Sequence, residues 1–448
     1  MKKLTRTISG ITPVAVMARP MGCPGRCVYC PTYPTAPQSY TPESPAVVRA
    51  RECGFDARQQ VEVRLRVLAE MGHPTDKVEL IVMGGTFPAA PEDYQSRFIQ
   101  DCYEALNGRP ATDLAEAQRV NETAARRAVG LCIETRPDYC SPEQIERMLS
   151  FGTTRVELGV QTLDDDIYRL VKRGHGVAEV AAATRLLKQH GLKVHYHWMP
   201  GLPGSTPEHD FALSRMLFED PRFRPDGLKI YPTMVVAGTE LEKWYDDGRY
   251  QPYDRETMTG LVADIKAIVP KYVRISRVLR DIPPKFIVGG LKDSLREAVQ
   301  QRMKAEGRAC RCIRCREYGH RRRAGQPAGE PKLVRLDYDA SDGREVCLSF
   351  EDHQETLFGM LRLRIQDEGP PAVIRELHVY GPEVPIGGRT PASAQHHGFG
   401  RALLAEAERL ARDEFHVPSL AVLSGVGARE YYADLGYHRA GHYMAKDL

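Results

Sequence analysis

The sequence contains no run of about 20 consecutive apolar residues, the length that a membrane-spanning helix requires, and its first residues lack the apolar core of a secretory signal. We therefore expect a soluble, cytoplasmic protein with no membrane partner. Hydrophobic residues make up 42% of the 448 residues, which is ordinary for a folded chain. A chain of this length can form two or three domains with substantial cores.

An excess of charge of one sign is also missing, because the formal net charge is only +3. The distribution is less even, since residues 271–285 hold basic side chains against a single acid, Asp281. These basic residues are Lys271, Arg274, Arg277, Arg280 and Lys285. Such a run can bind RNA phosphates in a protein near charge balance, although a solvated basic face is the alternative. On a β-strand, Arg274 and Arg280 would point to one side and Arg277 to the other.

The sequence also lacks the cysteine density of a disulfide-bonded protein, because eleven cysteines in 448 residues do not suggest a disulfide framework. Six of them form two tight groups that are typical of metal ligands. The isolated ones, which we expect to be mostly buried free thiols, are Cys53, Cys102, Cys132, Cys140 and Cys347.

The first group is Cys23, Cys27 and Cys30, with C-x3-C-x2-C spacing in a loop broken by glycine and proline. Three thiolates on one short loop can hold three irons of a 4Fe–4S cluster, which leaves the fourth iron open to a ligand. Half of a zinc ribbon is the alternative, but such ribbons usually pair two C-x2-C knuckles in one small module. The pattern resembles the signature of the radical S-adenosylmethionine enzymes, and this resemblance implies S-adenosylmethionine as a cofactor.

One apolar run precedes the cysteine loop and others follow it in alternation with helical stretches, so a parallel α/β sheet is expected. The strand candidates are Val14–Ala18, Val78–Met83, Gly130–Glu134, Arg155–Gln161, Lys193–Met199 and Gly227–Tyr231. Six βα units are too few for an eight-fold barrel. They suit the partial parallel (β/α)6 barrel of radical S-adenosylmethionine enzymes.

Polar and glycine residues gather where these strands end, and functional residues of parallel sheets belong at the carboxyl ends of strands. They are Gly84, Gly85, Thr86, Glu134, Gln161, Gly201 and Gly204. The family resemblance implies that Gly84–Thr86 bind the methionyl amine and that Gly201–Gly204 lie near the adenine. Lys229, in an otherwise apolar strand, predicts either a polar contact to the cofactor or a structural salt bridge.

The second cysteine group is Cys310, Cys312 and Cys315, with C-x-C-x2-C spacing. Three thiolates so close together indicate zinc with one further ligand. That ligand could be His320, a water or a distant residue, and a second iron–sulfur cluster is the alternative to zinc.

The last part of the chain changes character, because four alternating apolar segments predict an antiparallel meander. They are Leu333–Tyr338, Val346–Phe350, Leu357–Ile365 and Ala372–Val379. A Q-x-x-G-x-G loop then leads into a helix over 401–412, and a helix N-terminus can seat a pyrophosphate. The loop residues are Gln395, His396, His397, Gly398, Phe399, Gly400 and Arg401.

This order of elements, followed by a strand over 419–423 and a helix over 428–435, resembles the GNAT acetyltransferases. The resemblance implies acetyl-CoA as a cofactor and places Tyr431 and Tyr432 near the CoA sulfur. Glu376 and His378 are candidates for the catalytic base, and a structural role for either is the alternative.

We therefore expect four segments: a basic N-terminal arm (1–13), a radical S-adenosylmethionine domain (14–300), a Cys-rich, metal-binding basic linker (301–332) and a GNAT α+β domain (333–448).

The two halves in this order resemble the catalytic subunit of Elongator, over essentially the whole chain from about Ser9. The sequence segments on which this resemblance rests are Met83–Phe87, Gly227–Pro232, Arg280–Pro283, Arg375–Gly381 and Gln395–Gly400. It implies a tRNA-modifying acetyltransferase that places a carboxymethyl-type group on carbon 5 of the wobble uridine, with the anticodon stem-loop of tRNA as partner. The cysteine spacing is that of a prokaryotic-type member, which we expect to work without accessory Elongator subunits.

The combination of the two cofactors makes chemical sense. Carbon 5 of uridine is too weakly nucleophilic for ordinary acyl transfer, so a radical route is needed. A radical formed on the acetyl methyl group could add to the base, and hydrolysis of the thioester would leave a carboxymethyl group. Two other classes remain open at this point. One is a protein-lysine acetyltransferase with a structural iron–sulfur cluster, and the other is a non-catalytic tRNA-binding scaffold.

Overall fold

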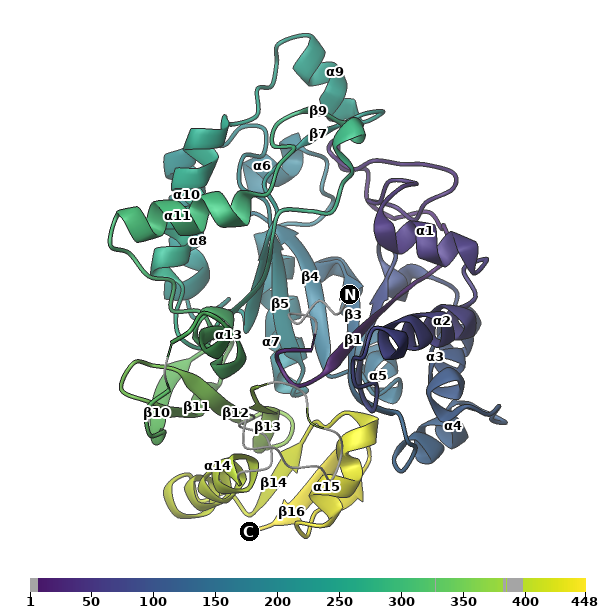
Figure 1. The fold of residues 1–448 in the computed structure, drawn as a ribbon, viewed down its shortest axis with the longest axis vertical. Coiled ribbons are helices and arrows are strands. Elements are labelled where there is room, and N and C mark those ends of the chain that lie inside the picture. Colours follow the sequence, from purple (N-terminus) through teal and green to yellow (C-terminus); the bar gives the residue numbers. More distant parts are fainter. Residues whose placement is uncertain (1–6, 327, 382–383, 385–397) are drawn as a thin grey trace.

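The computed structural model describes residues 7–326, 328–381, 384 and 398–448. Two seven-stranded sheets organise these residues. One sheet and its helices form the upper part of the molecule in Figure 1, and the other lies beneath it.

The first sheet is parallel throughout, with the order β1-β2-β3-β4-β5-β6-β8. Its strands are β1 (Thr12–Met17), β2 (Lys77–Met83), β3 (Arg127–Thr135), β4 (Arg155–Gln161), β5 (Lys193–Trp198), β6 (Gly227–Ile230) and β8 (Arg274–Val278). The expected partial parallel barrel is confirmed, but the sheet has one strand more than the six predicted. The additional strand, β8, lies inside the basic stretch, where charged residues interrupt the apolar pattern.

Helices cover the outer face of this sheet, because alternate strand residues such as Val78, Leu80 and Val82 point toward them and are fully buried. The covering helices are α2 (Ala57–Glu70), α3 (Glu92–Asn107), α5 (Pro142–Ser150), α7 (Val177–Gln189), α8 (Pro207–Glu219) and α10 (Arg255–Ile268). Side-chain caps start several of them, as where Ser141 and Gln144 form a capping box at α5.

The remaining elements of this half are short, and most of them lie at the ends of the strands. They are α1 (Pro45–Glu52), α4 (Leu114–Asn121), α6 (Asp165–Leu170), α9 (Glu240–Asp246), α11 (Leu295–Ala305), α12 (Ile313–Arg316), α13 (Tyr318–Arg323) and the paired strands β7 (Val235–Val236) and β9 (Ile287–Gly289).

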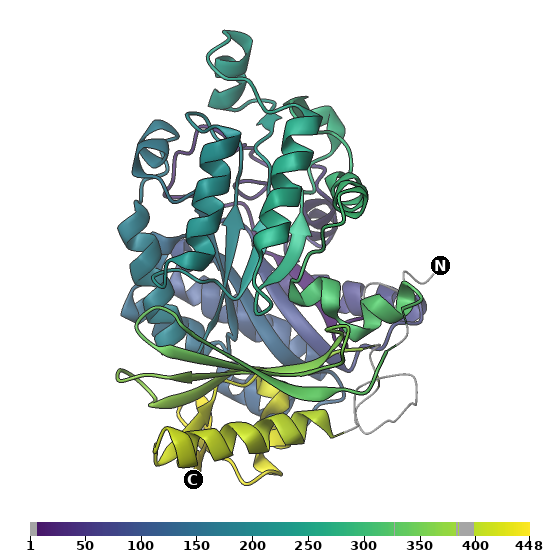
Figure 2. The same ribbon diagram turned by 90° about the vertical axis from the view of Figure 1, so that its left-hand side faces the viewer.

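The second sheet has the order β10-β11-β12-β13-β14-β16-β15 and contains the predicted antiparallel meander. Its strands are β10 (Lys332–Asp339), β11 (Arg344–Glu351), β12 (Leu357–Ile365), β13 (Ala372–Val379), β14 (Ser419–Val422), β15 (His438–Ala440) and β16 (Tyr443–Asp447). Only β13 and β14 run parallel to each other. Helix α14 (Phe399–Arg409) packs under the sheet in Figure 2, and α15 (Arg429–Ala433) follows β14.

The second sheet docks against the amino ends of the parallel strands, which leaves their carboxyl ends free. Arg375 on β13 makes a bidentate ion pair with Asp226, which precedes β6, at 2.7 Å for both hydrogen bonds. Arg375 also donates to the carbonyl of Leu192 at 3.1 Å, and Arg362 donates to the carbonyl of Tyr272 at 2.5 Å. These side chains are fully buried, so charge complementarity joins the two halves.

Among the described residues, no helix combines the length and hydropathy needed to cross a bilayer.

Replacing Arg375 with methionine is expected to lower the free energy of unfolding by about 3–5 kcal/mol, because Asp226 would remain buried without its partner. Arg409, half exposed and paired with Glu406 on the surface of α14, is the matched control. Its replacement by methionine should cost less than about 1 kcal/mol. Urea unfolding of both variants measures the difference, and equal losses would contradict a joining role for Arg375.

Candidate active site

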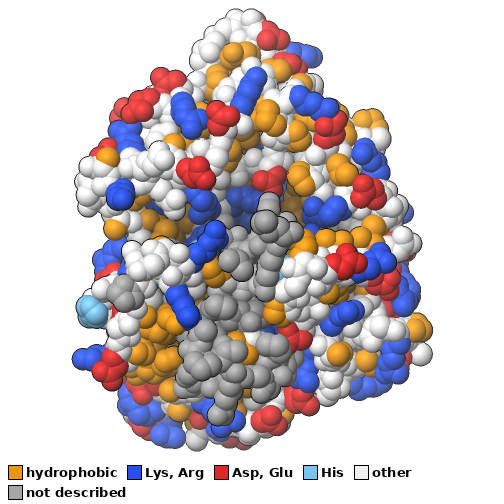
Figure 3. Space-filling view, viewed as in Figure 1, with side chains coloured by type: hydrophobic (Ala, Val, Ile, Leu, Met, Phe, Trp, Pro, Cys, Tyr) orange, Lys and Arg blue, Asp and Glu red, His pale blue; other side chains and the backbone are white. Residues whose placement is uncertain are grey.

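A cavity that is open to solvent lies at the carboxyl ends of the parallel strands. Its wall combines the N-terminal cysteine loop with residues that end the strands, including Gly85, Thr86, Glu134, Gln161 and Lys229. In Figure 3, which has the same view as Figure 1, the surface is hollowed near the middle, and lysine and arginine side chains lie inside the hollow. The structure therefore brings together most of the residues that the sequence placed at strand ends.

Each cysteine sulfur of the loop has a hydrogen-bond partner. The Gly25 amide donates to Cys23 Sγ at 3.4 Å, the Arg173 guanidinium to Cys27 Sγ at 3.4 Å and the Gln38 amide to Cys30 Sγ at 3.3 Å. Burial, together with the neighbouring Cys27, raises the pKa of the Cys30 thiol to about 12. The donors suit thiolates that a metal cluster has deprotonated, so the donor set fits a 4Fe–4S cluster.

The turn after β2 passes close to other parts of the chain, because a Cβ added at Gly84 would come 3.0 Å from Ala18 Cβ and one added at Gly85 would come 3.5 Å from Gln38 Cβ. Gly84 and Gly85 have φ angles of +129° and +84°, a region that favours glycine. Gln161, at the end of β4, also has a positive φ of +76°. Its buried Oε1 has no hydrogen-bond partner among the described residues, which leaves an acceptor in the cavity wall for a polar cofactor.

Gly201 and Gly204 do not line the cavity. Both have positive φ angles, but Gly201 faces the ring of Tyr253 and Gly204 faces the side chain of Leu170. They form the loop after β5, and their position near the adenine, which the family resemblance implies, stays a prediction.

Lys229 lies in a buried ion cluster. Its Nζ is 3.1 Å from Glu134 Oε1 and also pairs with Glu157, while Tyr40 donates to Glu134 at 2.9 Å. Burial opposes the charge on Lys229, but Glu157 and Glu134 outweigh it and hold the lysine pKa well above its usual value. Of the two roles that the sequence left open, the contacts match the structural salt bridge.

The oxygens of Glu134 and Glu157 and a ring nitrogen of His197 lie within 4.8 Å of one another, close enough to hold a metal ion. The Lys229 ammonium already bonds to both carboxylates. The Lys229 ammonium, rather than a metal ion, therefore balances the charge of the two carboxylates.

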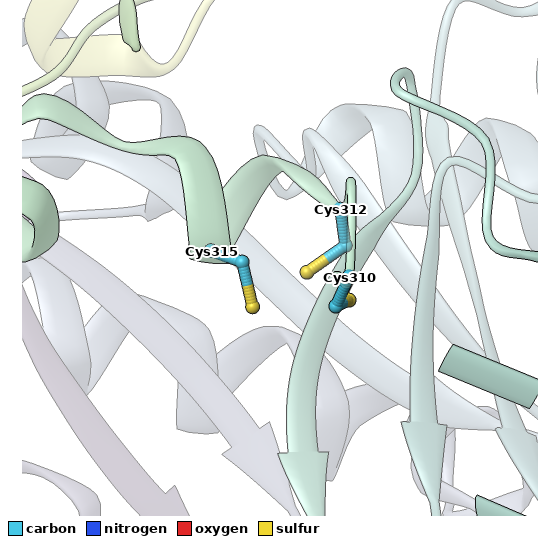
Figure 4. Close-up of side chains that lie close together, drawn as sticks. All are labelled: Cys310, Cys312 and Cys315. Carbon is cyan, nitrogen blue, oxygen red and sulfur yellow. The ribbon is translucent and has the colours of Figure 1, made fainter. Parts of the chain in front are cut away.

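The second cysteine group forms a compact set of sulfurs. The Sγ atoms of Cys310, Cys312 and Cys315 lie within 4.8 Å of one another, and Figure 4 shows the three side chains together. His320 is not among the residues whose ligand atoms meet this distance limit, and on α13 its Nε2 lies 3.6 Å from Glu317. Burial lowers the pKa of His320 to about 4.

The basic stretch divides into residues that face the cavity and residues that do not. Arg277 and Arg280 line the cavity, whereas Arg274 pairs with Glu317. The prediction that Arg274 and Arg280 share a side is wrong, because β8 ends at Val278 and Leu279 has a φ of +79°, which breaks the alternation.

The two lysines of the stretch pair with carboxylates away from the cavity. Lys271 lies 2.7 Å from Glu355, and Lys285 pairs with the exposed Glu43.

The N-terminus of α14 lies close to a tyrosine. Gly398, with a φ of +86°, caps the helix, and a Cβ added at Gly400 would come 3.1 Å from the Tyr431 hydroxyl. Tyr432, which contacts Tyr431 edge-to-face, is buried in the core of the second sheet. Tyr431 is therefore the one of the two tyrosines that lies at the helix terminus.

The other residues of this loop are less informative. Phe399 packs against the ring of Phe350 at 4.9 Å, and Arg401 is exposed. The predicted contacts of Gln395, His396 and His397 lie outside the described residues.

Glu376 and His378 have structural partners. Glu376 accepts from Arg362 at 2.8 Å and lies 3.5 Å from Lys193. Burial favours its neutral form, but these cations hold its pKa well below the usual range, so it is a poor proton acceptor. His378 Nε2 lies 2.6 Å from the Ser9 carbonyl, and burial lowers its pKa.

Arg173, Gln38 and Glu157 are site residues that sequence reasoning missed. Arg173 and Gln38 lie in loops without a motif, and Glu157 lies in the middle of a strand. Only the three-dimensional placement identifies them.

Three family models match the chain. They are the Radical SAM superfamily over residues 19–214, the Radical_SAM C-terminal domain over 225–305 and the Acetyltransferase (GNAT) family over 311–437. The cysteine-lined cavity and the α14 terminus thus belong to a radical SAM enzyme joined to a GNAT acetyltransferase.

Full-length relatives define the family more closely. The chain is 65% identical to the "tRNA uridine(34) acetyltransferase" of Dehalococcoides mccartyi over 100% of both chains. It is 43% identical to the human "Elongator complex protein 3", covering 100% of this chain and 86% of the relative.

A solved structure agrees with these relatives. The archaeal Methanocaldococcus infernus Elp3 with an N-terminal deletion superposes with a TM-score of 0.88 at 45% identity, over 99% of this chain and 100% of that one. The chain belongs to the family of the tRNA uridine(34) acetyltransferases and Elongator complex protein 3, which confirms the resemblance seen in the sequence.

Replacing Lys229 with methionine is expected to lower the free energy of unfolding of the cofactor-free chain by about 3–5 kcal/mol, because Glu134 would lose its cation and Glu157 would keep only Arg155, at 3.5 Å. Lys172, which is about half exposed and paired with Glu240, is the control, and its methionine variant should lose less than about 1 kcal/mol. A Lys229→Met chain as stable as wild type, with weakened S-adenosylmethionine binding, would instead make Lys229 a cofactor contact.

Proposed function

We propose that the chain is a tRNA-modifying acetyltransferase that uses acetyl-CoA and radical S-adenosylmethionine chemistry to form a carboxymethyl-type group on the wobble uridine. The observation that carries this proposal is the joining of two sites in one chain, a cysteine-lined cavity and a glycine-rich helix terminus. Full-length relatives named tRNA uridine(34) acetyltransferase support the choice of substrate. The same names give no support to the protein-lysine alternative.

In this proposal, Cys23, Cys27 and Cys30 hold the 4Fe–4S cluster, which when bound supplies the electron that cleaves S-adenosylmethionine. Gly84–Thr86 and the unpaired Gln161 Oε1 are the groups of the chain that would position the S-adenosylmethionine.

The α14 terminus is the proposed acetyl-CoA site. Gly398 and Gly400 would leave the helix N–H groups open to a pyrophosphate, and the Tyr431 hydroxyl beside Gly400 is the group that we propose donates a proton to the departing sulfur.

We assign the tRNA contact to the cavity-facing arginines Arg277 and Arg280, because both guanidinium groups lie at the cavity where the base must enter. An anticodon base can be splayed out of its loop at low cost. The other basic residues of the stretch, Lys271, Arg274 and Lys285, pair with carboxylates that do not line the cavity.

The second cysteine group is the proposed zinc site. Tetrahedral zinc with Zn–S bonds of about 2.3 Å places sulfurs about 3.8 Å apart, and the three Sγ atoms already lie within 4.8 Å of one another. Metal analysis should find zinc lost and iron retained in a Cys312→Ser variant, whereas loss of iron would favour a second cluster.

The four segments expected from the sequence remain our proposed domain division. We also propose that the protein acts in the cytoplasm without accessory subunits, which the similarity to bacterial and archaeal relatives supports.

tRNA is expected to stimulate thiol release from acetyl-CoA, because water must be kept from the acetyl group until the acceptor base is in place. Replacing Gly398 and Gly400 together with valine should abolish this release, since side chains would occupy the pyrophosphate approach. Iron content and tRNA binding should persist. Gly441→Val, at a positive-φ turn of the same domain with open space around it, controls for backbone strain. Equal thiol release with and without tRNA would contradict tRNA gating and would favour a protein-lysine acetyltransferase.

Replacing Arg277 and Arg280 together with alanine is expected to weaken tRNA binding and to reduce its log–log salt slope by roughly one unit per lost phosphate contact. The control is Arg249→Ala, which removes an arginine that is 58% exposed outside the cavity wall. Binding isotherms over a salt series measure the slope. An unchanged slope in the double variant would show that the RNA-binding surface does not include Arg277 and Arg280.

A further inference from the structure

Arg173 is a buried arginine that contacts the N-terminal cysteine loop. It follows α6 and is only 6% exposed. Its Nη1 donates to Cys27 Sγ at 3.4 Å. A full positive charge and a hydrogen bond therefore reach the same sulfur atom.

The guanidinium is held in this position from several sides. Its Nε donates to His175 Nε2 at 2.9 Å, and its Nη2 donates to the carbonyl of Gly159. A Cβ added at Gly159 would come 2.7 Å from Nη2, so glycine leaves the room that the arginine occupies. Arg136 fixes the backbone by donating to the Arg173 carbonyl at 2.9 Å.

No carboxylate within the part of the chain that the structure describes forms an ion pair with Arg173; its side-chain partners are a thiol, an imidazole and a carbonyl. A buried cation is costly unless a negative group compensates it. A cluster bound by three thiolates would supply that negative charge beside the guanidinium, and reduction would increase it.

We propose that Arg173, through its charge and its hydrogen bond to Cys27, raises the reduction potential of the cluster held by Cys23, Cys27 and Cys30. The charge and the N–H···S bond stabilise the reduced cluster more than the oxidised one, because reduction adds one negative charge close to the guanidinium. Electron uptake is thereby made easier. Gln38, which donates to Cys30 Sγ without a charge, has the same effect to a smaller degree.

This inference rests on the proposed cluster, and its test needs neither tRNA nor acetyl-CoA. Reconstituted full-length variants are titrated with dithionite, and electron paramagnetic resonance measures the reduced fraction. At the potential where wild type is half reduced, Arg173→Met should show a reduced-to-oxidised ratio at least tenfold lower, which is about 59 mV for a one-electron couple. Gln38→Leu should show a smaller decrease.

Two further variants separate the local contact from a general loss of charge. Arg169→Met removes an exposed arginine of α6 and should leave the ratio within twofold of wild type. Gly159→Ala keeps the charge but displaces the guanidinium, so it should lower the ratio. Should Arg173→Met fail to retain iron, Arg173→Lys and Arg173→Gln take its place, and the ratio should fall further in the glutamine variant.

Unchanged potentials in Arg173→Met and Gly159→Ala, equal potentials in the lysine and glutamine variants, or an equal fall in Arg169→Met would overturn the role of Arg173. A wild-type chain that takes up no iron would contradict the cluster assignment itself, which distinguishes the two failures.

Discussion

The bidentate ion pair between Arg375 and Asp226 is the interaction on which the rest of the structure depends. The Asp226 carboxylate also accepts from the Val194 amide at 2.8 Å, so one buried group links β5, the start of β6 and β13. Such a charge cannot be left unpaired in the interior without a large cost. The second sheet is therefore held at the amino ends of the parallel strands, and the carboxyl ends remain free to form the cavity.

This arrangement explains why the inner face of the first sheet can be so polar. Arg155, Glu157, Lys229 and Glu134 form a row of compensated charges across the sheet. Fixed charges of this kind cost no reorganisation during a reaction. The cysteine loop, the unpaired Gln161 acceptor and the cavity-facing arginines then lie around one polar space, as a reaction between a cofactor and an RNA base requires.

Much of this could be predicted from the sequence, because local chemistry determines it. The cysteine spacing, the alternation of apolar runs with helices and the antiparallel meander all identified their elements. The rest depends on contacts between residues that are distant in sequence. Leu279, with its positive φ, breaks the strand alternation, so Arg280 lines the cavity and Arg274 does not. For Glu376 the sequence left a catalytic and a structural role open, and only the fold shows its ion pair with Arg362. Nothing in the local sequence distinguishes Arg173 from a surface arginine.

The most direct test of the account follows the acetyl carbons into the product. The reconstituted protein is incubated with tRNA, S-adenosylmethionine, a reductant and acetyl-CoA that carries carbon-13 in both acetyl positions, and the tRNA is then digested to nucleosides for mass spectrometry. The account predicts a wobble uridine that carries both labelled carbons at carbon 5, and no labelled product when S-adenosylmethionine is omitted. Label on protein lysines with unlabelled tRNA, or labelled uridine formed without S-adenosylmethionine, would contradict it.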